Sequence, residues 1–225
     1  AAADDTVLLR RVISECADNR GLKATFMAKP FLEWPGNGMH VHASVLDENG
    51  DNIFAGEEGD KRLQHAAAGL LSTLKDTLLF YIPSFNGYRR LQAGSYAPTR
   101  IAWGRNNRSV AVRVPASDEK ARRLEHRMSG ADVNPYFVLA GVLGGMLEGI
   151  EAGKMPPPAV EGNAYNVPLP QLSDDMDDAI EDFERSDFIR RYFGAELRRI
   201  FGEIKRAELV AFDNEITPLE RSTYL

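Results

Sequence analysis

Three short segments of this chain alternate apolar and polar residues with a period of two, and helix-like segments separate them. The alternating segments are residues 39–45, 109–114 and 122–128. In a strand, this period places successive side chains on opposite faces. The strand-like and helix-like segments do not follow the regular βαβ order that builds a parallel sheet. The sequence therefore predicts an α+β fold with an antiparallel β-sheet and flanking helices.

Caps, breakers and periodicity predict the remaining elements. Two further strands are expected at residues 23–29, where Ala24, Phe26 and Ala28 alternate with polar or longer side chains, and at 101–103. Helices are expected over residues 5–19, 62–81 and 134–153, with an acidic helix from 173 and a long amphipathic helix from 186. We expect Cys16 to be buried on the first helix and the proline-rich residues 155–170 to be extended.

Composition excludes several classes of protein. The chain has 225 residues, of which 44% are hydrophobic and 27% charged, so it is neither disordered nor collagen-like. One cysteine cannot form an internal disulfide, so nothing requires an oxidising compartment. The most apolar segment, 136–146, is shorter than the roughly 20 residues that span a bilayer. We expect a cytoplasmic protein with no membrane partner. Because a helix is under way at once and the first residue is not Met, we also expect a piece of a longer chain.

Positive charge is concentrated between residues 89 and 130. The net charge is −6, which argues against a nucleic acid partner, yet this segment holds ten basic residues and three acidic ones. The basic residues are Arg89, Arg90, Arg100, Arg105, Arg108, Arg113, Lys120, Arg122, Arg123 and Arg127. A local, arginine-rich excess in an acidic protein indicates a compact anionic ligand.

Two of the alternating segments carry candidate ligands for a metal ion. In residues 39–45, His40, His42 and Ser44 share one face, and neutral imidazole binds divalent metals. The alternative is a pair of solvent-facing histidines. In residues 122–128, Glu125 lies between Arg123 and Arg127, so the carboxylate could bind a metal while Arg127 pairs with an oxyanion. The alternative here is a ladder of ion pairs across strands.

A third group combines Arg108 at the entrance of the 109–114 strand with Arg113 on it. Ser109 and Arg113 are expected to share one strand face, and two planar guanidinium groups suit a di- or triphosphate. The alternative is a solvated strand face. Arg90 and Lys120 in the same basic segment favour the phosphate interpretation. By contrast, the acidic residues of 174–184 lack the loop of a calcium site and indicate a solvated helix face.

These segments, in this order, resemble the catalytic domain of the glutamine synthetase family. The resemblance rests on residues 29–30, Gly-Asn-Gly-Met-His-Val-His-Ala-Ser at 36–44, Asn-Arg-Ser at 107–109, Glu125-x-Arg127, Asn-Pro-Tyr at 134–136 and Thr-Pro-Leu-Glu at 217–220. It implies the family's glutamine synthetase/guanido kinase-like fold, with residues 1–225 as the C-terminal part of the catalytic domain. The N-terminal β-grasp domain and the first catalytic strands, which carry further metal-binding glutamates, would precede it.

The resemblance also implies a reaction and a set of roles. ATP would phosphorylate the γ-carboxylate of glutamate, and an amine would then displace phosphate. His40 and Glu125 would bind Mg²⁺ or Mn²⁺. The nucleotide would contact His42, Ser44, Arg108, Arg113, Lys120 and Arg123. Gly36, Arg90 and Arg127 would hold glutamate. Arg127 would also neutralise the transferred phosphoryl group and the γ-carboxylate, and Arg108 would be the second catalytic residue.

One departure bears on the amine. Members that use ammonia carry a glutamate in the loop after the substrate arginine, and Tyr96 stands there in this chain. A neutral phenol cannot act as that anion, so the sequence is closer to members that ligate polyamines or monoamines. Glutamine synthetase proper is the alternative, and a nucleotide- or polyanion-binding module on the same fold is a non-enzyme one. Oligomers with shared active sites are typical of the family, and Tyr165 is interpreted as structural rather than as a site of modification.

Overall fold

The computed structural model describes residues 1–92 and 94–225, and its described part contains a four-stranded sheet with the strand order β1-β4-β3-β2. The strands are β1 (Val41–Ala43), β2 (Trp103–Arg105), β3 (Val112–Val114) and β4 (Leu124–His126). β4 pairs antiparallel with both β1 and β3, as predicted. Each strand has only three residues. β1, β3 and β4 are shorter than the alternating segments in which they lie, and β2 begins at Trp103, the last residue of the strand expected at 101–103.

Two strand predictions were wrong. β2 and β3 pair in parallel, because residues 106–111 carry the chain back to the start of β2, where the Ala111 amide donates to the Ala102 carbonyl at 3.1 Å. The predicted strand at 23–29 does not form. Ala24, Phe26 and Ala28 are less exposed than their neighbours, as the alternation indicated, but the Lys29 amide donates to the Asn86 side chain instead of a strand. A segment can therefore be extended and bury alternate side chains without pairing with a strand of a sheet.

The predicted helix over 62–81 is two helices, α2 (Gly56–Ser72) and α3 (Leu74–Tyr81). They are separated at Thr73, whose hydroxyl donates to the Gly69 carbonyl and whose backbone is not helical. The short helix α4 (Phe85–Tyr88) follows in the predicted loop, and the Ser84 hydroxyl accepts from its third residue. The turn after Val45 is present, with Gly50 at φ of 84°.

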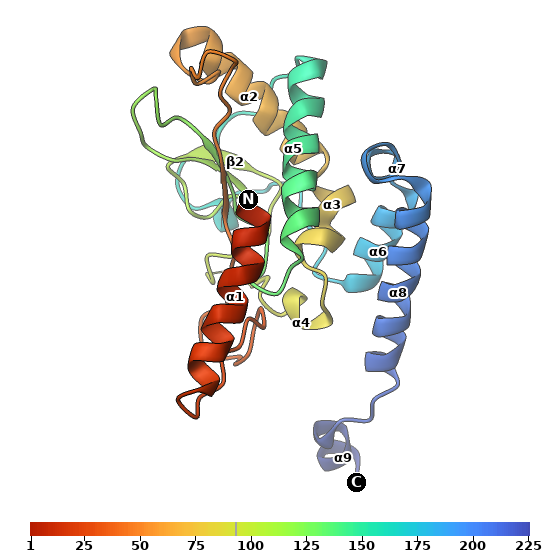
Figure 1. The fold of residues 1–225 in the computed structure, drawn as a ribbon. Coiled ribbons are helices and arrows are strands. Elements are labelled where there is room, and N and C mark those ends of the chain that lie inside the picture. The colour runs from red at the N-terminus through yellow and green to blue at the C-terminus, as the bar shows by residue number, and fades with distance from the viewer. Residues whose placement is uncertain (93) are drawn as a thin grey trace.

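Helix α5 (Pro135–Ala152) begins and ends close to the predicted residues. The Asn134 side chain accepts from the Tyr136 amide, and Gly153 ends the helix in the left-handed conformation. α5 lies along α2, and the two backbones touch through glycines (Figure 1). A Cβ on Gly69 would lie 2.0 Å from the Gly145 carbonyl oxygen. The glycines of α5 therefore allow close helix packing.

The C-terminal part is helical. α6 (Met176–Arg185) packs between α3 and α8 (Ala195–Asp213), while α7 (Asp187–Phe193), α9 (Pro218–Tyr224) and a 3₁₀ turn (Ala164–Asn166) complete the set (Figure 1). The predicted single helix from 186 is divided at Gly194, which has φ of 90°. The rings of Phe80, Phe183 and Phe201 contact one another in edge-on and tilted arrangements where these helices meet. Asp177 and Glu184 of α6 are exposed and half-buried, respectively, and both pair with Arg206.

Helix α1 (Ala2–Asp18) lies on α5 and contributes little to the core. Cys16 is exposed rather than buried, so that prediction was wrong. The reason is that α1 packs through a narrow face, which leaves Leu8 and Leu9 about 60% exposed. Within residues 1–92 and 94–225, no helix is both long and apolar enough to cross a membrane.

Candidate functional site

Glu125 lies at the centre of the candidate site, in the middle of β4. The register places it opposite His42 of β1 and Arg113 of β3. Its carboxylate is 2% exposed and accepts from Arg113 at 2.7 Å and from Arg127 at 2.6 Å. The predicted arrangement of opposite charges across and along the strands is therefore present. This arrangement allows the charges to be buried, because each has a counter-charge within hydrogen-bond distance.

His40 adds an imidazole to this cluster. Its Nδ1 lies 3.1 Å from a Glu125 carboxylate oxygen. Burial, and then the positive charge of Arg127, lower the pKa of His40 to about 4, so the ring is neutral at pH 7. Burial alone would raise the pKa of Glu125, but the guanidinium groups of Arg113 and Arg127 hold it below its usual range. A neutral imidazole beside an ionised carboxylate is a donor set that fits a divalent cation.

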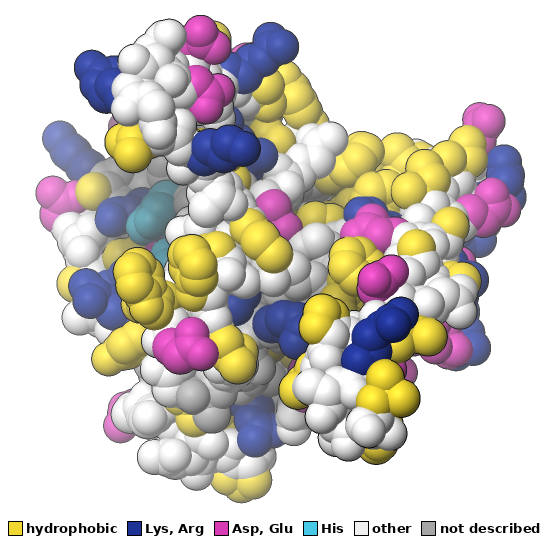
Figure 2. Space-filling model, turned by 90° about the horizontal axis from the view of Figure 1, so that it is seen from below, with side chains coloured by type: hydrophobic (Ala, Val, Ile, Leu, Met, Phe, Trp, Pro, Cys, Tyr) yellow, Lys and Arg dark blue, Asp and Glu magenta, His cyan; other side chains and the backbone are white. Residues whose placement is uncertain are grey.

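A pocket of about 460 Å³ opens over this cluster. It is lined by His40, Tyr96, Arg108, Arg113, Glu125 and Arg127. Arg127 also fixes the rim, since its second amino group donates to the carbonyls of Arg108 at 2.9 Å and Tyr96 at 3.5 Å. The structure thus brings together the predicted metal ligands and three predicted anion-binding arginines. Figure 2 shows histidine side chains set back in a recess with Lys and Arg side chains around it.

Gly36 and Arg90 lie side by side although 54 positions separate them in the chain. A Cβ on Gly36 would lie 3.1 Å from Cγ of Arg90. Arg90 is 6% exposed and donates to the Met128 carbonyl at 2.7 Å. Burial, followed by repulsion from Arg127, lowers the pKa of Arg90 to about 10. The predicted pair is therefore assembled at one edge of the cluster, and its contact with a ligand stays a prediction.

The four remaining predicted nucleotide contacts, His42, Ser44, Lys120 and Arg123, lie further out. Nε of Arg123 lies 3.1 Å from Nδ1 of His42, which links β1 to the start of β4. Ser44 and Lys120 are exposed, and neither lines the 460 Å³ pocket. This part of the candidate site is thus open surface beside a buried cluster.

Ser109 does not share a face with Arg113, so that prediction was wrong. Residues 109–111 precede β3, and the Ser109 hydroxyl accepts from the Ala164 amide at 2.9 Å and donates to Asn107. Asn107 in turn donates to the carbonyls of Val160 at 2.9 Å and Gly162 at 2.8 Å. Sequence reasoning missed this supporting role of Asn107, although the amide next to a serine in the Asn-Arg-Ser motif was a signal for it.

A second pocket of about 320 Å³ adjoins the first and shares Tyr96 and Arg108 with it. Its other lining residues are Gly94, Asn107, Ser109, Gly162, Asn163 and Tyr165. Tyr96 has φ of 58° and is 68% exposed. The Tyr165 hydroxyl donates to the Ala97 carbonyl at 2.7 Å, a structural contact, and burial raises the pKa of Tyr165.

Comparison with known proteins gives a consistent result. Gamma-glutamylputrescine synthetase PuuA of Escherichia coli is 37% identical over 97% of this chain and 47% of its own length. Gamma-glutamylethanolamide synthetase GlnA4 of Streptomyces coelicolor is 37% identical over 96% of the chain and 47% of its own length. Glutamine synthetase of Pyrococcus abyssi is also 37% identical, over 92% of the chain and 48% of its length.

A solved structure described as a GmaS/ADP complex superimposes with a TM-score of 0.90 at 31% identity, and the match covers 99% of this chain and 54% of that one. The chain thus spans about half the length of the relatives it matches. The family model described as the catalytic domain of glutamine synthetase matches residues 1–224. With this match over nearly every residue, the chain belongs to the glutamine synthetase family.

Proposed function

We propose that this chain forms the C-terminal part of the catalytic domain of an ATP-dependent glutamate–amine ligase. The observation that carries the proposal is the pocket in which the His40–Glu125 pair faces Arg108, Arg113 and Arg127. Such a pocket is complementary to a phosphate chain with its cation, beside a carboxylate substrate. The ADP bound in the GmaS complex supports a nucleotide ligand.

The proposed reaction has two steps. A γ-carboxylate oxygen of glutamate attacks the γ-phosphorus of ATP, the bond to ADP breaks, and γ-glutamyl phosphate forms. The amine nitrogen then attacks the acyl carbon, phosphate leaves, and the nitrogen loses a proton. Enzymes of phosphoryl transfer act mainly by positioning and charge neutralisation. Arg127, which lines the pocket, would neutralise the transferred group, and Arg108 and Arg113 would bind phosphates.

The other roles follow the position of each residue around the pocket. Gly36 and Arg90 would hold glutamate at one edge. The exposed group of His42, Ser44, Lys120 and Arg123 would hold the nucleotide at the other. His40 and Glu125 would bind Mg²⁺ or Mn²⁺, which would offset the negative charge of the phosphates. The described residues contain no cluster of three potential metal ligands, so oxygen atoms of substrate, water or other parts of the protein would complete the coordination.

The proposed amine is larger than ammonia. Tyr96 offers a phenol rather than a carboxylate at the rim shared by the two pockets, and the 320 Å³ pocket beside it has room for an alkyl chain. The names of PuuA and GlnA4 indicate putrescine and ethanolamine as amines of those relatives. Equal identity to a glutamine synthetase keeps ammonia as the second candidate. The full-length protein is proposed to be a cytoplasmic homo-oligomer whose subunits share active sites.

The test measures phosphate release by the full-length protein with ATP, Mg²⁺ and glutamate, and compares putrescine, ethanolamine and ammonia. We expect release with one of the two amines to exceed release with ammonia, and Arg127→Lys to abolish it. The isolated 225-residue chain should show no amine-dependent release. Faster turnover with ammonia would overturn the amine assignment. Nucleotide binding without any turnover in the full-length protein would favour a binding module instead.

A further inference from the structure

The middle of the loop that carries Lys120 has no buried side chain to fix it, although Pro115 at the start of the loop is buried. Every residue from Ala116 to Ala121 is exposed, and the loop joins β3 to β4. A loop without apolar contacts takes its position from polar contacts of its backbone. Within the loop, the Asp118 carboxylate accepts from the Ala121 amide and Arg123 donates to the Ala121 carbonyl. Two other side chains, which the proposed function does not use, bond the loop to the segment that leads into α2.

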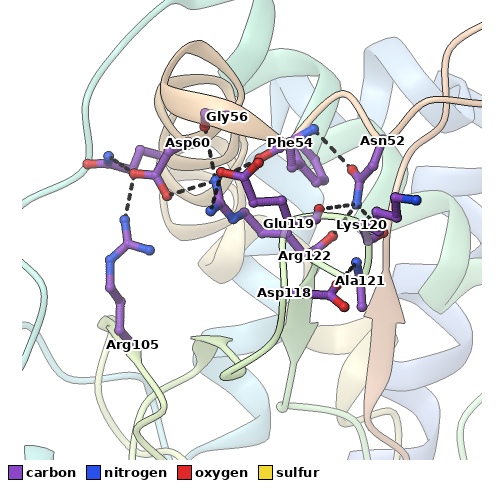
Figure 3. Close-up of polar contacts among 11 residues, drawn as sticks. Asn52, Phe54, Gly56, Asp60, Arg105, Asp118, Glu119, Lys120, Ala121 and Arg122 are labelled. Carbon is purple, nitrogen blue, oxygen red and sulfur yellow. Dashed lines mark hydrogen bonds and ion pairs between the residues drawn. The ribbon is translucent and has the colours of Figure 1, made fainter.

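The first of these is Asn52, which is 9% exposed and contacts the loop. Its amide nitrogen donates to the carbonyls of Lys120 at 3.0 Å and Arg122 at 2.8 Å, and a longer contact of 3.4 Å reaches Glu119. Its carbonyl oxygen accepts from the amide of Phe54 at 3.0 Å. Figure 3 shows this side chain between its own segment and the loop. Asn52 therefore fixes the loop from one side.

The second is Arg122, whose side chain crosses in the opposite direction. Its guanidinium donates to the carbonyls of Phe54 and Gly56, both at 3.0 Å. Phe54 is fully buried, and Gly56 begins α2. The loop is thus bonded to the start of α2 through Asn52 in one direction and Arg122 in the other (Figure 3).

The ion pairs of Arg122 are weaker constraints than these hydrogen bonds. Its distances to the carboxylates of Asp60 and Glu119 are 3.8 and 3.6 Å, too long for hydrogen bonds. Partly exposed ion pairs of this kind contribute little. By contrast, carbonyl groups of a buried segment lose a needed partner when the donor is removed. The backbone contacts, rather than the charges, hold the loop.

We propose that Asn52 and Arg122 are positioning residues that hold Lys120 and Arg123 in place for the nucleotide. This inference rests on the proposed function, which assigns Lys120 and Arg123 to ATP. Arg123 follows Arg122 directly and reaches His42, so a shift of the Arg122 backbone moves the guanidinium of Arg123. Arg90 and Gly36 are held by other segments. A less ordered loop should therefore weaken the binding of the nucleotide and leave the binding of glutamate unchanged.

The test measures ADP affinity by calorimetry, and the KM values of ATP and glutamate, on the full-length protein. Asn52→Asp keeps the acceptor for Phe54 and turns an oxygen towards the loop carbonyls. Arg122→Gln removes the guanidinium. We expect each substitution to weaken the affinity for ADP roughly tenfold, as the loss of one or two hydrogen bonds would. The KM of glutamate should stay within about twofold of the parent value. Arg122→Lys keeps one donor and should restore part of the affinity.

Arg62→Gln is the matched control. Arg62 is exposed and also donates to a carbonyl of the same segment, that of Ile53 at 3.1 Å, but it does not touch the loop. Its ADP affinity should equal that of the parent. If the Asn52→Asp protein does not fold, the ADP affinities of the two Arg122 variants test the inference.

Arg123→Ala separates this inference from the proposed function. If Arg123→Ala leaves ADP affinity unchanged, the assignment of the loop to the nucleotide is wrong. If Arg123→Ala weakens ADP but the Asn52 and Arg122 variants bind it as the parent does, only the inference is overturned. It is also overturned if those variants raise both KM values equally, because a merely structural role would do so.

Discussion

The two ends of the proposed site are held in place by different physical means. Glu125 of β4 and Arg127, directly after the strand, are buried and position each other through opposite charges. In the loop before β4, Lys120 is exposed, and hydrogen bonds from Asn52 and Arg122 to backbone carbonyls, rather than ion pairs, hold the loop. In the buried cluster, the charges that would bind phosphate also stabilise the fold. In the loop, the charges that would bind the nucleotide do not stabilise the fold, so a change there should alter nucleotide binding with little effect on folding.

The largest effect is expected from Glu125→Gln. The amide leaves Arg113 and Arg127 without a counter-charge, and Arg127 has a side chain only 5% exposed. Breaking a buried ion pair in this way costs about 3–5 kcal/mol. We expect that loss in the free energy of unfolding, measured with urea at pH 7. Arg123→Gln, on the exposed side, is the control and should cost about 1 kcal/mol or less. Similar losses for both variants would break the comparison.

Low pH should also lower the stability of the fold through the buried residues around Glu125. His126, between Glu125 and Arg127, is 1% exposed, and burial lowers its pKa to about 3 from an ordinary 6.5. The unfolded chain therefore binds a proton that the folded chain does not, and stability falls as the pH drops below about 6.5 towards 3. His40, with a pKa of about 4, acts in the same direction.

His126→Leu tests this directly. Neither ring nitrogen of His126 has a partner among the described residues, so the substitution leaves no partner unpaired. Removing one such group should flatten the slope of the free energy of unfolding between pH 6 and pH 5 by up to about 1.4 kcal/mol per pH unit. Urea unfolding at several pH values measures the slope. An unchanged slope would show that the buried face does not carry the acid sensitivity.

The smallest effect is expected from Arg105→Gln. Arg105 is about half exposed and pairs with Asp60 of α2 at 2.7 Å. Exposed pairs contribute about 0–1 kcal/mol, and salt screens them. We expect a change within that range, measured by urea unfolding at low salt and absent at high salt. A loss above 2 kcal/mol would mean that exposed charges also hold this side of the site.

Local features of the sequence predicted local structure well. Asn134-Pro135 and Gly153 bound a helix because a cap, a proline and a left-handed glycine each act within a few residues. Gly194 is the same kind of signal inside a periodic segment, yet a single continuous helix was predicted across it. The failure at 23–29 has another cause. Alternation reports which side chains face inward, and it does not report whether a partner strand exists.

The candidate site was predicted only where one strand carries it. Glu125 and Arg127 lie two residues apart, so the period of a strand places them on one face. The contact of Gly36 with Arg90 depends on how distant segments pack, and only the resemblance to a family indicated it. Asn52 carried no signal, because an asparagine after a turn looks the same whether its amide faces water or a loop 68 residues away.

The glycine contact between α2 and α5 restricts how the protein can respond to a ligand. A Cβ on Gly149 would lie 2.1 Å from the His65 carbonyl oxygen, so no side chain separates the helices that could change rotamer and absorb a displacement. The two helices must therefore move as one body. Since the start of α2 anchors the loop of Lys120, adjustment to a bound molecule has to occur within the loop itself. Gly69, Gly145 and Gly149 thus tolerate no side chain, although none of them lines either pocket of the candidate site.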